Sequence, residues 1–288
     1  MIRRSLMFIA LATACGGSRS DPAETSPSTT ARPATPPAAA ADPSTLRYAA
    51  GNGRYKVETN MQVAQDMMGN VQEVSSDMMM ILSTTLTEES GNLLLAATLD
   101  SVTFTGSMPG LDGSAFNAAR GRTFRARFTP AGRPVAGANP DSGDALMTQL
   151  SRGVREFLAV LPATIAAGGT WTDTVSETAP IPGGSGTLTT RSIRNNRVVG
   201  WETRDGARAL HLTVQGSYTM SGSGEVQGGT AVEMTGSGTA TADRWVSAAG
   251  VLLSSTGRDS TNLTVNVPSV GMTIPIRQVQ RTTITRLQ

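Results

Sequence analysis

The sequence predicts a mainly β protein: a long antiparallel sheet, with a curved, half-barrel-like form as one option, and one amphipathic helix packed on it. Three observations carry this prediction. Apolar and polar residues alternate along several stretches of residues 46–288, only the segment 142–161 has apolar residues at helical spacing, and the chain is rich in glycine, with 31 residues, but only 16% charged. We therefore expect a single antiparallel β domain over residues 46–288.

The first strands are predicted from strict alternation and from their turns. Apolar residues share one side of residues 54–63, a turn follows at Gly69-Asn70, and residues 74–82 alternate again. In residues 93–105 the alternation slips between Leu99 and Val102, which indicates a β-bulge. A short strand over 122–129 is expected to pair with a return strand across Pro130–Arg133.

One helix interrupts the strands. Pro140 with Asp141 or Ser142 supplies N-terminal capping chemistry, and Pro162 ends the segment. The apolar stripe recurs every three or four residues: Leu146, Leu150, Val154, Phe157, Leu158 and Leu161. A helix over about 142–161 would lay this stripe on one face of the sheet.

Strands resume after Gly168-Gly169. The pairs Asn195-Asn196 and Asp205-Gly206 are typical of two-residue hairpin turns, and they predict a short strand between them. Long, thin strands are predicted in the region rich in glycine, serine and threonine, residues 217–242. The last strands are expected over 245–253, 263–267 and 274–287.

Composition and charge exclude several functional classes. A coiled coil, a disulfide scaffold and a multi-span membrane protein are excluded by composition, and a Cys/His zinc site by the presence of one cysteine and one histidine. The formal net charge is +2. Without Arg3 and Arg4, 22 basic residues balance 22 acidic residues and the net charge is zero. Because the arginines are scattered, we expect no nucleic-acid partner.

The first fifteen residues carry the most specific motif. A basic start, Met1–Arg4, is followed by an apolar stretch over 5–14 that is too short to span a bilayer, and Ala12-Thr13-Ala14 precedes Cys15. This pattern resembles the lipobox of bacterial lipoproteins. The resemblance implies that residues 1–14 are a signal peptide, that Cys15 becomes a lipidated N-terminus, and that the protein is anchored to a membrane. Since Gly16 is not aspartate, the resemblance favours the outer membrane, on its periplasmic or surface side, over the inner membrane.

Residues 15–45 are predicted to be a tether. The stretch consists mainly of proline, alanine, serine and threonine, and it has almost nothing to bury. It is therefore expected to be disordered and to hold the folded domain away from the membrane surface.

This arrangement resembles the periplasmic carriers of lipoproteins and lipids, in which a curved sheet and helices enclose an apolar cavity. The pattern of Gly121–Phe124, Gly132, Leu161-Pro162 and Gly168–Trp171 also resembles exported lipoproteins of unknown function. The first resemblance implies a cavity for acyl chains, and neither implies a catalytic motif.

The sequence carries few motifs of reaction chemistry. Nucleophile elbows, phosphate loops and dinucleotide motifs are missing from the sequence, and His211 stands alone on a predicted strand, opposite in phase to Leu210 and Leu212. We therefore expect a protein without catalytic residues, cofactor or metal site, although a hydrolase using His211 and a serine distant in sequence stays an alternative.

The methionine-rich stretches suggest a binding surface, because flexible thioethers adapt to varied apolar shapes. The candidate ligand-binding residues come from two strands and from the helix: Met61, Met78, Met80, Leu150, Val154, Phe157 and Leu158. The expected function is non-enzymatic binding of a lipid or another apolar ligand. The alternative is a module that docks an envelope protein through sheet edges or loops.

Overall fold

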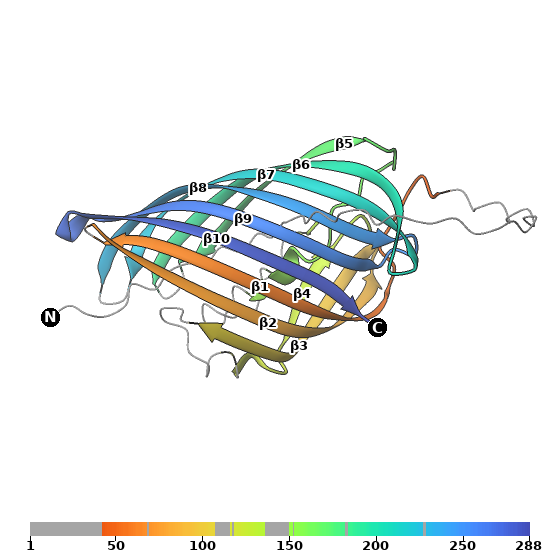
Figure 1. The fold of residues 1–288 in the computed structure, drawn as a ribbon, viewed down its shortest axis with the longest axis horizontal. Helices are drawn as coiled ribbons and strands as arrows, with labels where there is room; N and C mark the ends of the chain where they lie inside the picture. Colours follow the sequence, from red (N-terminus) through yellow and green to blue (C-terminus); the bar gives the residue numbers. More distant parts are fainter. Residues whose placement is uncertain are drawn as a thin grey trace, which may run out of the picture.

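The structure is a computed structural model that describes residues 42–67, 69–106, 116, 118–135, 150–151, 153–181, 184–226 and 229–288. One antiparallel sheet of ten strands dominates it and curls into a half-barrel (Figure 1). The strands are β1 (Gly51–Met67), β2 (Asn70–Glu89), β3 (Asn92–Gly106), β4 (Thr123–Phe128), β5 (Thr170–Pro180), β6 (Ser185–Arg204), β7 (Ala207–Val226), β8 (Thr230–Ser247), β9 (Leu252–Val267) and β10 (Met272–Leu287). A 3₁₀ turn, η1 (Pro268–Val270), joins the last two strands.

The strand order shows how the sheet is assembled. It runs β4-β3-β2-β1-β10-β9-β8-β7-β6-β5, so every pair of neighbouring strands is consecutive in the chain except β1 and β10. That pairing extends from Arg54 opposite Leu287 to Gln65 opposite Ile276. The first and last strands therefore lie at the centre of the sheet, and β4 and β5 form its two edges.

Most of the strands predicted from alternation are confirmed, and β1 and β2 extend beyond their predicted limits. The predicted bulge is confirmed as well: Ile81 pairs with Ser101 and Leu82 with Leu99, which leaves Asp100 as the extra residue. The Asp100 carboxylate accepts hydrogen bonds from Ser83 Oγ at 2.7 Å and from Arg54 Nε at 3.3 Å. The bulge thus places a carboxylate where two neighbouring strands can donate to it.

The two predicted hairpin turns had different outcomes. Asp205-Gly206 is a tight turn between β6 and β7, with φ of 50° and 77°, the positive values that a type I′ hairpin needs. The turn predicted at Asn195-Asn196 is wrong, because both residues lie inside β6. The buried Asn196 amide donates hydrogen bonds to Asp173 and to backbone carbonyls, and these contacts hold the residue in an extended strand.

The helix in the structure ends earlier than predicted, because the apolar stripe continues to Leu161 while the helix ends at Arg155. Residues 150, 151 and 153–155 are helical, and residues 142–149 lie outside the described part of the chain. After Arg155 the chain leaves the helix, because its backbone groups bond to other segments. Ala159 N–H donates to the Tyr48 hydroxyl at 2.9 Å, and Leu161 N–H donates to the Ala131 carbonyl at 2.8 Å.

The contacts of the fold begin before Leu46. Arg208 donates two hydrogen bonds to the Asp42 carboxylate, at 2.6 and 2.7 Å, and Ile165 N–H donates to the Ser44 carbonyl. The last residues of the predicted tether therefore lie against the domain. The signal peptide, Cys15 and the tether up to residue 41 fall outside the described residues.

The concave face of the sheet buries two apolar clusters. The larger one joins β1–β4 and β6–β9 to the segments around residues 46–48, 116–119 and 150–161. The smaller one gathers residues from β6–β10 toward the opposite ends of the strands, together with Ile181. Between them lie buried polar groups: Tyr218 O–H donates to Asp259 Oδ1 at 2.7 Å, and Asp259 is fully buried. Burying a carboxylate requires such hydrogen bonds.

We predict that Gly238→Ala destabilises the fold. Gly238 lies directly opposite Tyr218, and a Cβ there would come within 2.2 Å of the Tyr218 ring and 2.7 Å of the Ser260 carbonyl. The tyrosine would have to move away from Asp259, so the free energy of unfolding should fall by about 2 kcal/mol. Urea denaturation followed by circular dichroism measures the change.

Gly216→Ala is the matched control. Gly216 lies on β7, and a Cβ there makes ordinary contacts, the closest at 3.4 Å from the Ile193 carbonyl. This variant should stay within about 0.5 kcal/mol of the wild type. Equal losses in the two variants would show that the packing of Tyr218 over Gly238 is not what makes the position sensitive.

Candidate functional site

A cavity of about 140 Å³ lies on the concave face, between the sheet and the helical residues near Val154. Its wall is formed mainly by the three adjacent strands β1, β2 and β10. The strands β3, β4, β8 and β9 and two short segments around Phe116 and Val154 complete it. Thirteen apolar side chains line it: Val57, Met61, Met78, Met80, Leu82, Leu99, Phe104, Phe116, Phe124, Leu150, Val154, Phe157 and Ile284.

Six of the seven predicted binding residues meet at this cavity: Met61, Met78, Met80, Leu150, Val154 and Phe157. The seventh, Leu158, does not line the cavity and is buried in the larger apolar cluster. Strand alternation explains the methionines, because Met78 and Met80 point to the concave face while Met79 points outward and is 40% exposed. The hypothesis thus named residues that the fold brings together from three separate segments.

Two tyrosines position the segment that covers the cavity. The Tyr55 ring meets the Phe157 ring edge to face at 4.9 Å, and the Tyr55 hydroxyl donates to the Leu252 carbonyl at 3.0 Å. Burial raises the pKa of Tyr55 to about 12. Burial also raises the pKa of Tyr48, opposed in part by the positive charge of Arg244. Both phenols therefore stay neutral and can hold Phe157 and Ala159 in place.

An aromatic pair forms another part of the wall. Phe104, near the end of β3, stacks on Phe116 with ring centroids 4.9 Å apart and planes inclined by 18°. Both rings line the cavity. Stacked aromatic side chains give a rigid apolar surface suited to flat or alkyl ligands.

The remaining wall is polar, and sequence reasoning missed it. Its side chains are Thr59, Ser76, Glu156, Arg244, Ser255, Gln280 and Thr282. Thr59 and Thr282 hydroxyls lie 3.3 Å apart, and Gln280 Nε2 donates to Thr282 Oγ1 at 3.3 Å. The signal was in the strand pattern, since Arg244 shares its phase with the buried Ala242 and Val246. Polar residues at inward positions distinguish this wall from an ordinary core.

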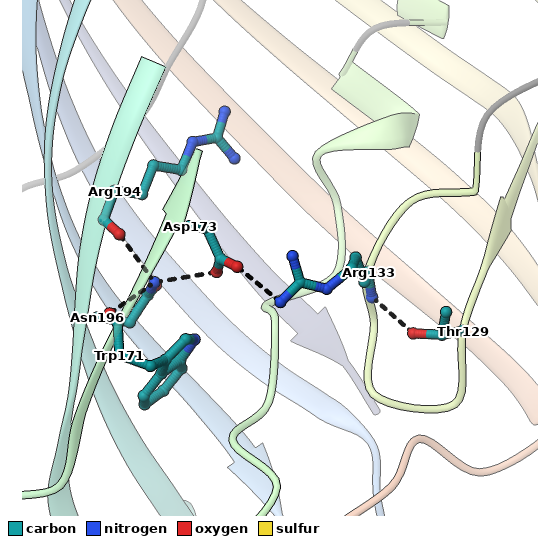
Figure 2. A network of polar contacts seen from close by, with 6 residues as sticks. All are labelled: Thr129, Arg133, Trp171, Asp173, Arg194 and Asn196. Carbon is teal, nitrogen blue, oxygen red and sulfur yellow. Dashed lines mark hydrogen bonds and ion pairs between the residues drawn. The ribbon is translucent and has the colours of Figure 1, made fainter. Parts of the chain in front are cut away.

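A second polar cluster joins the two edges of the curled sheet. Arg133, in the turn after β4, reaches Asp173 on β5 with Nη2 and Oδ1 2.6 Å apart (Figure 2). Asn196 Nδ2 donates to the other Asp173 oxygen at 3.1 Å, and Thr129 Oγ1 accepts from Arg133 N–H. Because Asp173 is buried, its carboxylate depends on these donors. The ion pair between Arg133 and Asp173 therefore links the turn after β4 to β5.

His211 lies apart from the cavity, and both its ring nitrogens face carboxylates. Nε2 is 2.8 Å from Asp243 Oδ1, Nδ1 is 3.6 Å from Glu202 Oε2, and the ring stacks on Trp245 at 4.6 Å. Arg204 covers the same indole, 3.7 Å from the ring centroid. A general base for a serine needs one nitrogen directed at the hydroxyl, and this arrangement directs neither nitrogen at one.

Within the described residues, His, Cys, Asp and Glu side chains form no group of three that could hold a metal ion. In the same part of the chain, every helix is too short or too polar to cross a membrane.

Comparisons with known proteins give weak structural likenesses. No family model matches the chain, and no curated protein matches it significantly. Among solved structures, it is similar to OccK8 (OprE) of Pseudomonas aeruginosa, with a TM-score of 0.23 and 9% identity over 82% of this chain and 98% of that one. A DUF1329 family protein from Desulfovibrio piger has a TM-score of 0.17 and 11% identity over 82% of this chain and 85% of that one. At these values neither likeness bears on function.

We predict that Arg133→Gln loosens the contact between the sheet edges. The change leaves the buried Asp173 carboxylate with the Asn196 amide as its side-chain donor among the described residues, so the free energy of unfolding should fall by about 1–3 kcal/mol. Urea denaturation at pH 7 measures the loss.

Arg127→Gln is the matched control, because it removes the same charge from a pair with Glu89 in which both side chains are 46% exposed. Such surface pairs contribute less than about 1 kcal/mol. If Arg127→Gln costs as much as Arg133→Gln, the burial of Asp173 is not what gives the edge contact its strength.

Proposed function

We propose that this domain binds a small apolar ligand in the cavity and is held at an envelope membrane by a lipid on Cys15. The observation that supports binding is the cavity itself, a space of about 140 Å³ with a mostly apolar wall and a few polar side chains. Small-molecule sites combine these two features. A protein cavity of about 150 Å³ lined by leucine, isoleucine and phenylalanine accepts benzene, so the enclosed part of the ligand is about one ring or a short alkyl chain.

Packing energetics also favour an occupant. The cavity opens to solvent near Gly153, so an apolar ligand that covers its apolar wall gains about 25 cal/mol for each Å² of apolar surface removed from water. The methionines could adjust to shrink the space, but they adapt equally well to a ligand. An apolar guest recovers the dispersion contacts that the wall otherwise lacks.

We predict that Gly153→Leu blocks ligand binding without destabilising the domain. Gly153 is exposed and also lines the cavity, so it lies at the mouth of the cavity. A Cβ atom at this position meets no atom within 4 Å, so a larger side chain has room there. Leucine is also a better helix former than glycine by roughly 0.7 kcal/mol. The affinity for 4-phenylbutanamide, a neutral probe, should fall at least tenfold by isothermal titration calorimetry, while the melting temperature stays equal or rises.

Met220→Leu is the control for this experiment. Met220 lies in the smaller apolar cluster, away from the cavity, so its replacement should leave probe affinity unchanged. If purified residues 42–288, which keep the contacts of Asp42 and Ser44, bind no probe and carry no lipid by native mass spectrometry, the binding proposal fails. Crosslinking of a stoichiometric protein neighbour in intact cells would then support the docking alternative.

The membrane anchor is tested separately. Lipidation at Cys15 predicts a mature protein that lacks residues 1–14 and carries acyl chains, because stable anchoring takes more than one chain. The Cys15→Ser variant should lose the acyl mass and leave the membrane fraction. Intact-mass analysis of protein from its native host decides the matter, and a retained leader or an unmodified thiol would contradict the anchor.

A further inference from the structure

One residue of the cavity wall carries a charge that the wall does not balance. Arg244, near the end of β8, lines the cavity from the concave face. Its Nη1 donates a long hydrogen bond of 3.5 Å to the Glu156 carbonyl, and its buried Nε has no hydrogen-bond partner among the described residues. No carboxylate in that part of the chain forms an ion pair with Arg244. A guanidinium in such surroundings is costly unless an anion accompanies it.

The acidic group nearest in the wall is engaged elsewhere. Glu156 also lines the cavity, but its carboxylate accepts from Arg194 Nη2 at 3.0 Å. Arg194 thus engages the Glu156 carboxylate, and no ion pair joins Glu156 to Arg244 among the described residues. The positive charge of Arg244 lowers the pKa of the buried Tyr48 against the larger effect of burial.

We propose that the ligand is a monoanionic amphiphile, a carboxylate with an aromatic ring or a short alkyl tail. The inference rests on the proposed binding function and names the chemical class that the cavity takes. The carboxylate pairs with Arg244, where a guanidinium can donate two parallel hydrogen bonds. The tail lies along the methionines and the Phe104–Phe116 pair. A single unbalanced cation suits one negative charge, which favours a carboxylate over a phosphate dianion.

Polar neighbours extend the site for the headgroup. Ser255 lies directly opposite Arg244 in the register of β8 and β9, and Gln280 and Thr282 line the same cavity from β10. Gln280 donates one N–H to Thr282, so its second N–H and the Ser255 hydroxyl are the groups that could orient carboxylate oxygens. The apolar residues of β2 and β3 form the opposite part of the wall. The cavity thus has one charged side and one apolar side, as an amphiphile requires.

The test compares 4-phenylbutyrate with its neutral isostere 4-phenylbutanamide by isothermal titration calorimetry. The wild type should bind the carboxylate at least tenfold more tightly than the amide, and more so at low ionic strength. Arg244→Met should bring the ratio of the carboxylate affinity to the amide affinity close to one, and Arg244→Lys should keep part of the preference. Because the arginine is unbalanced in the ligand-free protein, Arg244→Met should also leave the melting temperature equal or higher.

Arg258→Met is the matched control, since Arg258 is an exposed residue of the adjacent strand β9 and its loss changes the net charge equally. It should keep the carboxylate preference. Equal binding of both probes by the wild type, or loss of the preference in Arg258→Met, would overturn the anion proposal and leave apolar binding intact. If neither probe binds, the anion proposal fails, and the binding proposal fails with it unless lipid co-purifies with the protein.

Discussion

The pairing of β1 with β10 is the constraint on which the rest of the structure depends. It joins residues more than two hundred positions apart in the sequence and connects the arm β2–β4 to the arm β5–β9. The cavity straddles this junction, with Met61 on β1 facing Gln280 on β10 in the register. Because β10 contributes Gln280, Thr282 and Ile284 to the wall, the cavity is complete only when β10 is paired with β1.

The curl of the sheet creates a second requirement, which is to cover the concave face. The described segments 129–135 and 156–165 contribute to this cover with largely irregular backbone, so their polar groups need partners that a long helix would have supplied internally. Tyr48 and the carbonyls of Pro130 and Ala131 provide some of them. The result is a cover fixed at several points. It can hold Phe157 in position without filling all the space beneath it.

How far the sequence predicts this molecule depends on the range of the interactions. Period-two alternation shows which side of each strand is buried, so the inward methionines and the bulge at Asp100 could be found from local pattern alone. The extended conformation of Asn196 could not be predicted in this way, because its local turn preference is overridden by a hydrogen bond to Asp173 on the neighbouring strand. The end of the helix at Arg155 depends likewise on partners distant in sequence, such as Tyr48 and Ala131.

Arg244 shows a different reason why sequence reasoning fails. The alternation along β8 shows that the Arg244 side chain points inward. A polar residue at an inward position can pair with a buried acid, reach solvent or face a cavity, and only the fold distinguishes these outcomes. Here Glu156 is engaged by Arg194, and the opposing wall is apolar.

The polarity of the cavity is built into the sheet. A belt of inward polar residues crosses adjacent strands between the two apolar clusters, with Tyr218, Asp259 and Thr261 hydrogen-bonded to one another and Gln280 opposite Asp259 in the register. Since Gln280 also lines the cavity, the belt ends at its polar wall. A one-residue shift of β10 against β9 would turn Gln280 to the outer face and separate it from Asp259. The register that places Gln280 opposite Asp259 therefore also orients the polar side of the cavity, so the polar belt and the cavity wall depend on the same strand pairing.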